Sequence, residues 1–411
     1  MLLLSVLPLL RQPVRTLLAI LGVAAVGALL FDMLLLSHGL VLSFRDLLDR
    51  AGFDVRVLAS DAPPFSGPRI PKAASVAEQL SRLSEVETVL QIRVGEADFV
   101  AGKDGAAAPT GERGDSSGRT KTVEFIGVDQ NVRPMWTLVQ GHDLPKDSKS
   151  PAVVINRNVA RLLGLAPGGQ LTLRGHCSDA AAALPPIAFS VAGVVDFPFD
   201  DAGAWTAAGS IANVARLCGN EDDDEAEMLM VRSRAGAGAS IAAAAVRAAR
   251  PELYVVTNED LVERFSRVEF SYFRQISAVL ATVTLFFGFL LIAVLLTVSV
   301  NQRLGEIAAL RALGLSRSRV VSGVLTESFL LVLAGGILAV PLGAVLSLWL
   351  DGILRAMPGV PADLHFFVYE PRALLLHGAL LACAAAAAAA YPMRIVATLP
   401  IASTLRREVV S

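Results

Sequence analysis

The chain has 411 residues, of which 54% are hydrophobic and 18% are charged, and its mean hydropathy is +0.56. This composition is more apolar than that of an ordinary water-soluble domain, so it argues against a soluble enzyme and favours a protein embedded in a lipid bilayer. The formal net charge of -2 supplies no basic surface for nucleic acid, and no nucleic-acid partner is expected.

Four long apolar stretches set the topology that the sequence predicts. Each has at least the ~20 residues that a helix needs to cross hydrocarbon, and they lie at residues 16–36, 276–300, 320–350 and 373–393. The first also resembles the core of a secretory signal peptide, but it is longer than the usual ~7–15 residues and no small-residue cleavage site follows it cleanly. We therefore expect a membrane α-helical protein with four transmembrane helices and an uncleaved first helix.

The positions of the positive charges predict the orientation. Arginines flank the apolar stretches in short segments with few acidic residues: Arg11, Arg15, Arg303, Arg311, Arg317, Arg319, Arg394, Arg406 and Arg407. All five lysines lie instead in the long segment between the first and second stretches. Because positive charges stay in the cytoplasm, we expect both termini there, and the long segment in the periplasm of a bacterium with an inner membrane.

The long segment, about residues 38–270, alternates strand and helix patterns. Alternating or β-branched runs predict strands at 53–58, 123–128, 189–195 and 228–231, and helical spacing predicts helices at 73–83, 157–163 and 241–250. We therefore expect a large α+β periplasmic domain inserted between the first and second transmembrane helices. Composition predicts solvated loops at 102–119, 179–186 and 221–225, and the last, an acidic run, lacks the ligand spacing of a calcium loop.

The end of the long segment predicts an amphipathic helix. Residues 259–275 carry charges yet keep Leu261, Phe265, Val268 and Tyr272 at three- and four-residue spacing. A helix running straight into the second span would form a rigid stalk. A helix lying on the bilayer surface is the alternative.

The three cysteines leave the redox state open. Cys383 lies inside the fourth apolar stretch, whereas Cys177 and Cys218 lie in the long segment, where an oxidising compartment permits a disulfide. Two free thiols are the favoured interpretation, and the disulfide is the alternative.

No pattern of catalytic, metal-binding or cofactor-binding residues is present. The five histidines are scattered, and neither H-E-x-x-H nor G-x-S-x-G occurs. A phosphate-binding loop is also missing, because the single Gly-Lys pair, at residues 102–103, has Ala97 and Asp104 where a glycine and a hydroxyl are required. The chain is therefore predicted not to be an enzyme, and ATP would have to be bound and hydrolysed by another subunit.

The cytoplasmic loop at 301–319 carries the strongest local pattern. Leu304, Ile307 and Ala308 recur at helical spacing, Arg303 and Glu306 form an i,i+3 pair, and Gly314 followed by Ser316 can end one helix and begin the next. From spacing alone, a short helix resting at the membrane surface is an equal alternative to a functional one.

Small and polar residues inside the apolar stretches predict helix packing. Gly335, Ala339 and Gly343 recur every four residues in the third stretch, and Ser347 continues the row. Glu327, near the cytoplasmic start of that stretch, is interpreted as a partner of an arginine in the loop or as an interfacial carboxylate. Asp32 is expected near the outer interface.

Several ordered motifs resemble one family. They are residues 303–314 (RLGEIAALRALG), Glu327 leading to Gly335-Gly336, the periplasmic segments 125–129, 139–141, 153–156, 160–173 and 189–195, and the ending 391–406. In this order they resemble the FtsX-like permeases, the MacB and lipoprotein-exporter type of ATP-binding-cassette (ABC) transporter, also called type VII.

The resemblance implies a domain organisation and a division of labour. Residues 1–37 would form the cytoplasmic N-terminus and first span, 38–270 the periplasmic domain with its stalk, and 271–411 the FtsX-like domain with the cytoplasmic tail. The implied ATPase-coupling residues are Arg303, Gly305, Glu306, Ile307, Leu310, Arg311 and Gly314, and the implied packing and polar residues of the membrane are Glu327, Gly335, Ala339 and Gly343.

The resemblance also implies partners. They are a separate cytoplasmic ABC ATPase, a second permease copy or a paralogue, and in some members a periplasmic adaptor protein, with a lipoprotein, peptide or amphiphile as substrate. In one branch the same architecture instead transmits ATPase motion to a periplasmic cell-wall hydrolase and moves nothing, which is the alternative function. The macrolide exporter carries its ATPase on the same chain, whereas this chain has none.

Overall fold

The computed structural model describes residues 13–62, 67–100, 122–147, 149–221, 223–267, 269–302, 304–305, 308 and 316–398. The chain divides into two compact units. The membrane unit consists of Met1–Leu42, Arg267–Ile353 and His365–Ser411, and the extracytoplasmic unit consists of Ser43–Ser266 and Leu354–Leu364.

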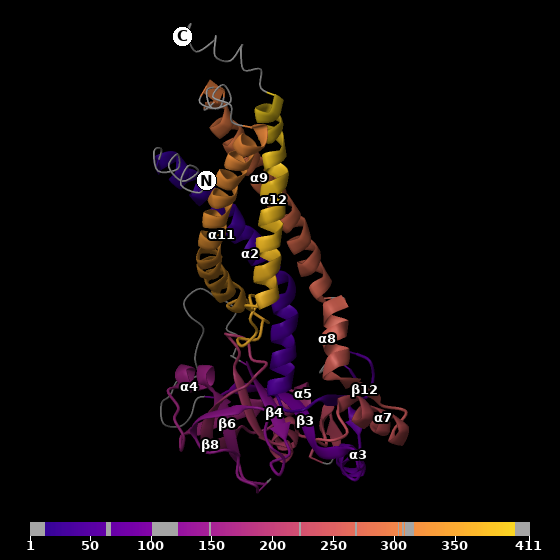
Figure 1. The fold of residues 1–411 in the computed structure, drawn as a ribbon. Coiled ribbons are helices and arrows are strands. Elements are labelled where there is room, and N and C mark those ends of the chain that lie inside the picture. Colours follow the sequence, from indigo (N-terminus) through magenta and orange to yellow (C-terminus); the bar gives the residue numbers. More distant parts are fainter. Residues whose placement is uncertain are drawn as a thin grey trace. The chain divides into compact units, whose positions relative to one another are not determined.

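Within the described residues, four long helices make up the membrane unit (Figure 1). They are α2 (Pro13–Arg50), α9 (Glu269–Gln302), α11 (Arg317–Arg355) and α12 (Pro371–Thr398). Each contains a segment long and apolar enough to cross a membrane, at Thr16–Arg50, Ser271–Gln302, Phe329–Arg355 and Pro371–Ala390. The prediction of four apolar helices, with the large domain between the first and the later three, is confirmed.

The helix α2 is longer than its apolar stretch. It continues past residue 36 to Arg50, and it ends where Gly52, at φ +78°, turns back so that its N–H donates to the Asp49 carbonyl. The added turns contain no proline, and they keep Leu40, Leu47 and Leu48 buried. The apolar stretch in the sequence ends at residue 36. The turns that follow are amphipathic, and a search for apolar runs does not detect them.

The four helices share one apolar core. Its buried members come from all of them: Val23, Leu30, Ile292, Leu296, Val332, Leu381, Ala385, Ala388 and Ala389. The alanine run of α12 supplies three of these positions, and small side chains there allow neighbouring helices to approach closely. Large apolar side chains such as Phe286, Val345 and Leu348 remain exposed on the surface, as expected of a face that contacts lipid.

The extracytoplasmic unit is built on a twisted sheet, ten-stranded within the described residues, with the order β12-β1-β11-β3-β4-β9-β6-β8-β5 and with β7 pairing to β3 and β8. Its strands are β1 (Val55–Leu58), β3 (Val86–Phe99), β4 (Thr122–Val128), β5 (Thr137–Gly141), β6 (Ala152–Asn156), β7 (Gln170–Gly175), β8 (Ile187–Asp196), β9 (Thr206–Ser210), β11 (Met228–Ser233) and β12 (Tyr254–Thr257). The pairs β4–β9 and β6–β8 are parallel, and the other pairs are antiparallel. A separate ribbon pairs β2 (Ile70–Pro71) with β10 (Glu225–Ala226).

Helices cover this sheet. They are α3 (Ala73–Ser81), α4 (Arg157–Leu163), α5 (Asp179–Ala182), α6 (Ile211–Cys218), α7 (Ala239–Ala249) and α8 (Asn258–Arg267). In one apolar cluster α3 and α7 pack on β1, β3 and β11, and in another α4 and α6 pack on β4, β6 and β8. Along β11, Leu229 and Val231 enter the first of these clusters, whereas Met228 and Met230 enter a third one. Both sheet faces are therefore buried, which confirms the α+β class and explains the nearly continuous apolar strand sequences.

Most of the helices and strands predicted for the extracytoplasmic unit are present in the structure, whereas the loop predicted at 179–186 is not entirely a loop. The predicted strands correspond to β1, β4, β8 and β11, and the predicted helices to α3, α4 and α7. The predicted loop at 179–186 is wrong at its start, because Ser178 accepts a hydrogen bond from the Ala181 N–H at 3.2 Å and begins the short helix α5. The glycine-rich loop at 102–119 lies outside the described residues.

The amphipathic segment at 259–275 is helical wherever it is described. It comprises α8 and the start of α9, and residue 268 between them lies outside the described residues. Leu261 and Phe265 are partly buried, whereas Tyr272 is exposed. The rigid stalk remains a prediction.

Candidate functional site

Most of the predicted ATPase-coupling residues lie outside the described part of the chain. These are Arg303, Glu306, Ile307, Leu310, Arg311 and Gly314, whereas Gly305 is helical. The exposed Ser316 immediately precedes α11, and its carbonyl accepts from the Arg319 N–H at 3.1 Å. The coupling role of this segment therefore remains a prediction.

The small residues of α11 lie against α2. A Cβ atom built on Gly335 would lie 2.6 Å from Cγ1 of Val23, and one on Gly343 would lie 3.0 Å from Cδ1 of Phe31. Ala339 is fully buried, and its Cβ is 2.8 Å from the position that a Cβ on Gly27 would take. The two helices thus approach so closely that larger side chains would collide, as expected of a small-residue contact in a membrane.

Polar side chains lie beside this contact. Asp32, which the sequence places near the outer interface, is fully buried by protein, and a Cβ on Gly343 would lie 3.3 Å from its Oδ1 atom. His377 of α12 is also buried, with its ring centroid 5.4 Å from that of Phe31. Neither side chain has a hydrogen-bond partner among the described residues. Glu327 lies in α11, but its side chain is outside the described part.

A buried polar cluster ties together the two ends of the extracytoplasmic unit. Arg56 of β1 donates to the Asn258 side chain, and Asn258 donates to Asp49 at 3.1 Å and to the Phe53 carbonyl at 3.2 Å. Burial lowers the pKa of Arg56 to about 10, and the carboxylates of Asp49 and Asp54 oppose that shift. The cluster joins the end of α2 to the start of α8, the helix that precedes the second span. Sequence patterns missed it, although an arginine inside an apolar strand was a usable signal.

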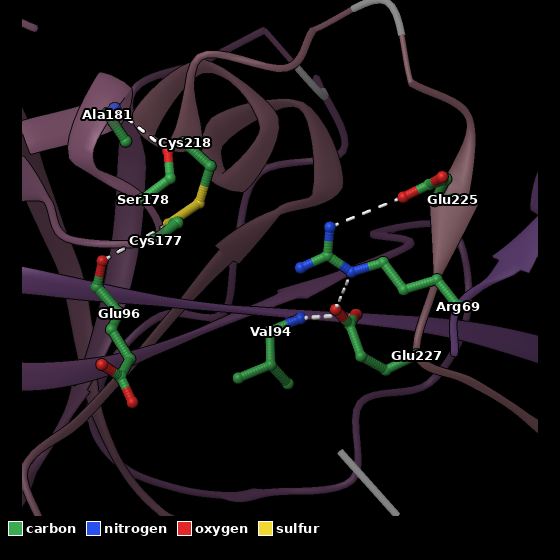
Figure 2. The surroundings of a disulfide bond; sticks show 9 residues. All are labelled: Arg69, Val94, Glu96, Cys177, Ser178, Ala181, Cys218, Glu225 and Glu227. Atoms are coloured by element: carbon green, nitrogen blue, oxygen red, sulfur yellow. Dashed lines mark hydrogen bonds and ion pairs between the residues drawn. A yellow bond between two sulfur atoms is a disulfide. The ribbon is translucent and has the colours of Figure 1, made fainter. Parts of the chain in front are cut away.

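The extracytoplasmic unit contains a disulfide between Cys177 and Cys218 (Figure 2). Their Cα atoms are 5.4 Å apart and the bond closes a separation of 41 residues, so the favoured prediction of two free thiols is wrong. A Cβ on Gly95 would lie 2.8 Å from the Cys218 sulfur, so the bond occupies space that only glycine leaves open. The chain distance between the cysteines gave no sign of this proximity, which results from the pairing of β7 with β3 and the packing of α6 on β3. Disulfides persist in oxidising compartments, in agreement with an extracytoplasmic location for this unit.

A charged cluster lies near the disulfide and accounts for part of the acidic run (Figure 2). Arg69 pairs with Glu227 at 2.7 Å and with Glu225 at 3.5 Å, and Glu227 also accepts from the Val94 N–H at 2.8 Å. Arg93 donates to the Asp223 carbonyl at 2.9 Å, and burial, followed by the charge of Arg69, lowers the pKa of the Arg93 guanidinium.

The same acidic run also contacts the start of helix α3. The Asp224 carbonyl and carboxylate accept from the N–H groups of Ala73 and Ala74, at 3.1 and 2.9 Å, at the start of α3. Glu225 forms part of β10. The prediction of a solvated loop at 221–225 therefore holds for Glu221, Asp223 and Asp224, which are exposed and lie outside helices and strands, and is wrong for Glu225, which is partly buried in β10. Across the described residues, no group of three or more His, Cys, Asp or Glu side chains could hold a metal ion.

Comparison with protein families gives two matches. Residues 16–249 match the MacB-like periplasmic core domain, and residues 278–401 match the FtsX-like permease C-terminal domain. The first match begins in α2 and ends with α7, and the second covers most of α9 and all of α11 and α12. A comparison with curated protein sequences finds no match.

Three solved structures are similar to about half of the chain. The periplasmic region of MacB from Actinobacillus actinomycetemcomitans is 12% identical, with a TM-score of 0.37, over 52% of this chain and 92% of that one. The extracellular domain of the noncanonic ABC-type transporter YknZ from Gram-positive bacteria is 12% identical, with a TM-score of 0.33, over 50% of this chain and 98% of that one. A domain of a putative permease protein from Porphyromonas gingivalis is 16% identical, with a TM-score of 0.30, over 50% of this chain and 88% of that one.

The two family matches follow each other along the chain and together include most of its apolar helices and of the domain between the first two. The chain is a multi-pass membrane protein with an extracytoplasmic domain, and it belongs to the FtsX-like permeases of the ABC transporter class, with a MacB-like periplasmic core domain.

Proposed function

We propose that this chain is the transmembrane permease subunit of an ATP-driven export or mechanotransmission complex. The observation that carries the proposal is the FtsX-like match over residues 278–401, which includes the segment joining α9 to α11. A separate cytoplasmic ABC ATPase supplies the energy, and the FtsX-like permease match supports this assignment. A second permease copy or a paralogue completes the membrane part, and a periplasmic adaptor is a further candidate partner.

The orientation that suits this function places both termini in the cytoplasm of a bacterial cell and the large domain in the periplasm. The arginine-rich cytoplasmic segments support it through the positive-inside rule. The Cys177–Cys218 bond supports it independently, because reducing cytoplasm disfavours structural disulfides.

The proposed substrate is a lipoprotein, peptide or amphiphile taken from the periplasm or the outer leaflet. The buried cluster of Arg56, Asn258 and Asp49 supports a mechanical role, because it joins the end of α2, which contains the first span, to the start of α8, the helix that precedes the second. Movement of those helices would then displace the sheet as one body. The same cluster would serve a scaffold that activates a cell-wall hydrolase, so the partner that purifies with the permease distinguishes the two functions.

The test is a double variant in the coupling segment, Glu306→Lys with Gly314→Val. Charge reversal alters a side chain that is predicted to contact the ATPase, and a β-branched residue disfavours the helix end that the sequence predicts at Gly314. We expect normal amounts of membrane-inserted protein, but a tagged complex purified from native membranes whose ATPase no longer responds to the permease.

The matched control is Glu259→Lys with Gly236→Val, which makes the same changes at an exposed position of α8 and at a glycine with free space around it. It should leave permease-stimulated ATP hydrolysis unchanged. Persistence of full stimulation in the Glu306/Gly314 variant would show that energy does not enter through residues 303–314.

A further inference from the structure

The connection between α11 and α12 is hydrogen-bonded to the sheet of the extracytoplasmic unit. In residues 356–364, here called the α11–α12 loop, the Gly359 N–H donates to Oδ2 of Asp201 at 2.7 Å. The Ala362 N–H donates to the Asp200 carbonyl at 2.7 Å, and Pro361 forms an antiparallel bridge with Asp201. The loop is therefore paired to the segment that precedes β9.

The loop has internal bonds that limit its freedom. Arg355, the last residue of α11, donates from Nη1 to the Ala362 carbonyl at 3.2 Å. Gly359 takes the left-handed conformation, at φ +79°, that the turn requires. The Leu364 N–H donates to the Pro361 carbonyl at 2.9 Å, and the Leu364 side chain is buried. These contacts make the loop a defined structure that cannot absorb movement as a slack linker would.

The partner segment is in turn fixed to two strands. The Asp200 carboxylate accepts from Nδ2 of Asn156 at 2.7 Å and from Oγ1 of Thr206 at 2.8 Å. Asn156 ends β6 and accepts from the Val159 N–H at the start of α4, and Thr206 begins β9. A displacement of the α11–α12 loop would thus reach neighbouring strands of the sheet through charge-assisted hydrogen bonds.

The residues that flank the loop on its two sides are bonded to each other within the membrane unit. Asp351 of α11 is buried, and it accepts from the Phe366 N–H at 2.7 Å and contacts Nδ1 of His365 at 2.9 Å. His365 and Phe366 directly follow the α11–α12 loop in the chain. The segment after the loop is therefore fixed to the same helix that enters it.

We propose that the α11–α12 loop is a permanent mechanical link that carries movement of α11 and α12 into the sheet, with Asp201 as the positioning residue of the joint. This inference rests on the proposed function, because the movement arises from ATP hydrolysis by the partner. It adds a third point of transmission to the two helices that enter and leave the domain. The link acts by staying joined throughout the cycle.

The first variant is Asp201→Asn. Its amide oxygen can still accept from the Gly203 N–H, as Oδ1 of Asp201 does at 2.8 Å, but the –NH2 group cannot accept from Gly359. Loss of a charge-assisted bond should speed hydrogen exchange of the Gly359 and Ala362 amides about tenfold or more. Asp147→Asn is the control, because Asp147 caps the Lys149 N–H within its own exposed turn and, among the residues that the structure describes, forms hydrogen bonds only with that turn.

The second variant restores the joint covalently. Asp201 and Pro361 form an antiparallel bridge, and the hydrogen bond beside it, from the Ala362 N–H to the Asp200 carbonyl, makes them a non-hydrogen-bonded pair. Cα atoms in such a pair are about 4.5 Å apart, a distance that a disulfide can span. In the double variant Asp201→Cys with Pro361→Cys, we therefore expect the α11–α12 loop to be released from the segment before β9 when the cysteines are reduced, and joined to it when they are oxidised. The wild type with the same reductant controls for the Cys177–Cys218 bond.

The measurement is hydrogen exchange of tagged complexes purified from native membranes, in ATP with vanadate and in ADP. In the wild type and in Asp147→Asn, nucleotide should change exchange in β6 and β9, and in Asp201→Asn this change should be lost. The cross-linked pair should regain it. Two outcomes would overturn the link alone. In one, Asp201→Asn keeps the nucleotide response of the wild type although the Gly359 amide exchanges fast. In the other, the cross-linked pair loses that response. No nucleotide response in the wild type overturns the proposed function and the link with it.

Discussion

Gly95 shows how one residue decides what its neighbours can do. It lies in β3 beneath the Cys177–Cys218 bond, and any side chain there would meet the two sulfur atoms within 3.1 Å. The Cys177 sulfur, which carries no proton in the disulfide, lies 3.5 Å from the Glu96 carbonyl. The disulfide thus joins the end of β7 to the end of α6 across β3, and the β3 residue beneath it, Gly95, has to be glycine.

Replacement of Cys218 by serine should destabilise the extracytoplasmic unit. A disulfide that closes a 41-residue separation lowers the entropy of the unfolded chain enough to contribute about 4 kcal/mol. We expect a lower midpoint of thermal unfolding in detergent, followed by the fluorescence of Trp136 and Trp205. Reductant should lower the midpoint of the wild type and leave that of Cys218→Ser unchanged. Cys383→Ser removes the free thiol in α12 as a control, and an equal effect from it would contradict the assignment.

At the scale of elements, the pattern of α11 predicts a face for close helix approach, but it does not say which helix meets that face. The four-residue spacing of Gly335, Ala339 and Gly343 indicates a face for close approach, and the structure places α2 on that face. Spacing cannot tell which helix arrives, because every apolar helix offers similar side chains. The partner is visible only in atoms such as Val23 Cγ1 and Phe31 Cδ1.

Gly335→Ala should weaken the packing of α2 on α11. The new methyl group would lie 2.6 Å from Val23 Cγ1 and 2.7 Å from Val23 Cβ, so one of the helices has to move, at a cost of about 1–3 kcal/mol. Gly352→Ala is the matched control on the same helix, because nothing lies within 4 Å of its Cβ position and alanine favours a helix by ~1 kcal/mol. Unfolding in mixed detergent micelles measures both. Equal stability of the two variants would refute the close contact.

The sheet was less accessible to prediction than the helices. The predicted strand β4 alternates between exposed and buried residues over most of its length, whereas β6 and β9 are buried at every position and so show no alternation. The 14-residue strand β3 pairs with β11 over its first half and with β4 and β7 over its second half, and only the second half shows a regular alternation of burial. Such patterns depend on the tertiary structure, which a local sequence window does not contain.

The candidate site was predictable only in part for the same reason. Motifs pointed to the coupling segment, whereas the buried cluster at Arg56 and the joint at Asp201 consist of single polar residues separated by 150 or more positions from their partners. Nothing in the local sequence distinguishes Asp201 from other turn aspartates such as Asp147. Their different roles follow from which distant backbone N–H groups the fold brings to them.

For the whole molecule, orientation in the membrane is the prediction to test. In a Cys383→Ser background, Ser81→Cys in α3 and Ser316→Cys before α11 place single thiols at two exposed positions. A maleimide that cannot cross the inner membrane should label residue 81 from the periplasm once the outer membrane is permeabilised. It should label residue 316 only after the inner membrane is opened. Labelling of both residues in cells with a closed inner membrane would contradict a cytoplasmic loop between α9 and α11.

The contact between α2 and α11 also sets an order of events during synthesis. Asp32 leaves the ribosome about three hundred residues before Gly343, the glycine that lies against it in the finished protein. In the interval the chain must translocate a domain whose sheet is complete only when β12 pairs with β1. The first helix therefore enters the bilayer with its carboxylate not yet covered by α11, and its final environment forms only when the third and fourth helices insert. Membrane integration of this permease is thus completed from the C-terminal end, and a nascent chain that stops before α11 would present an uncovered Asp32 to the quality-control machinery of the cell.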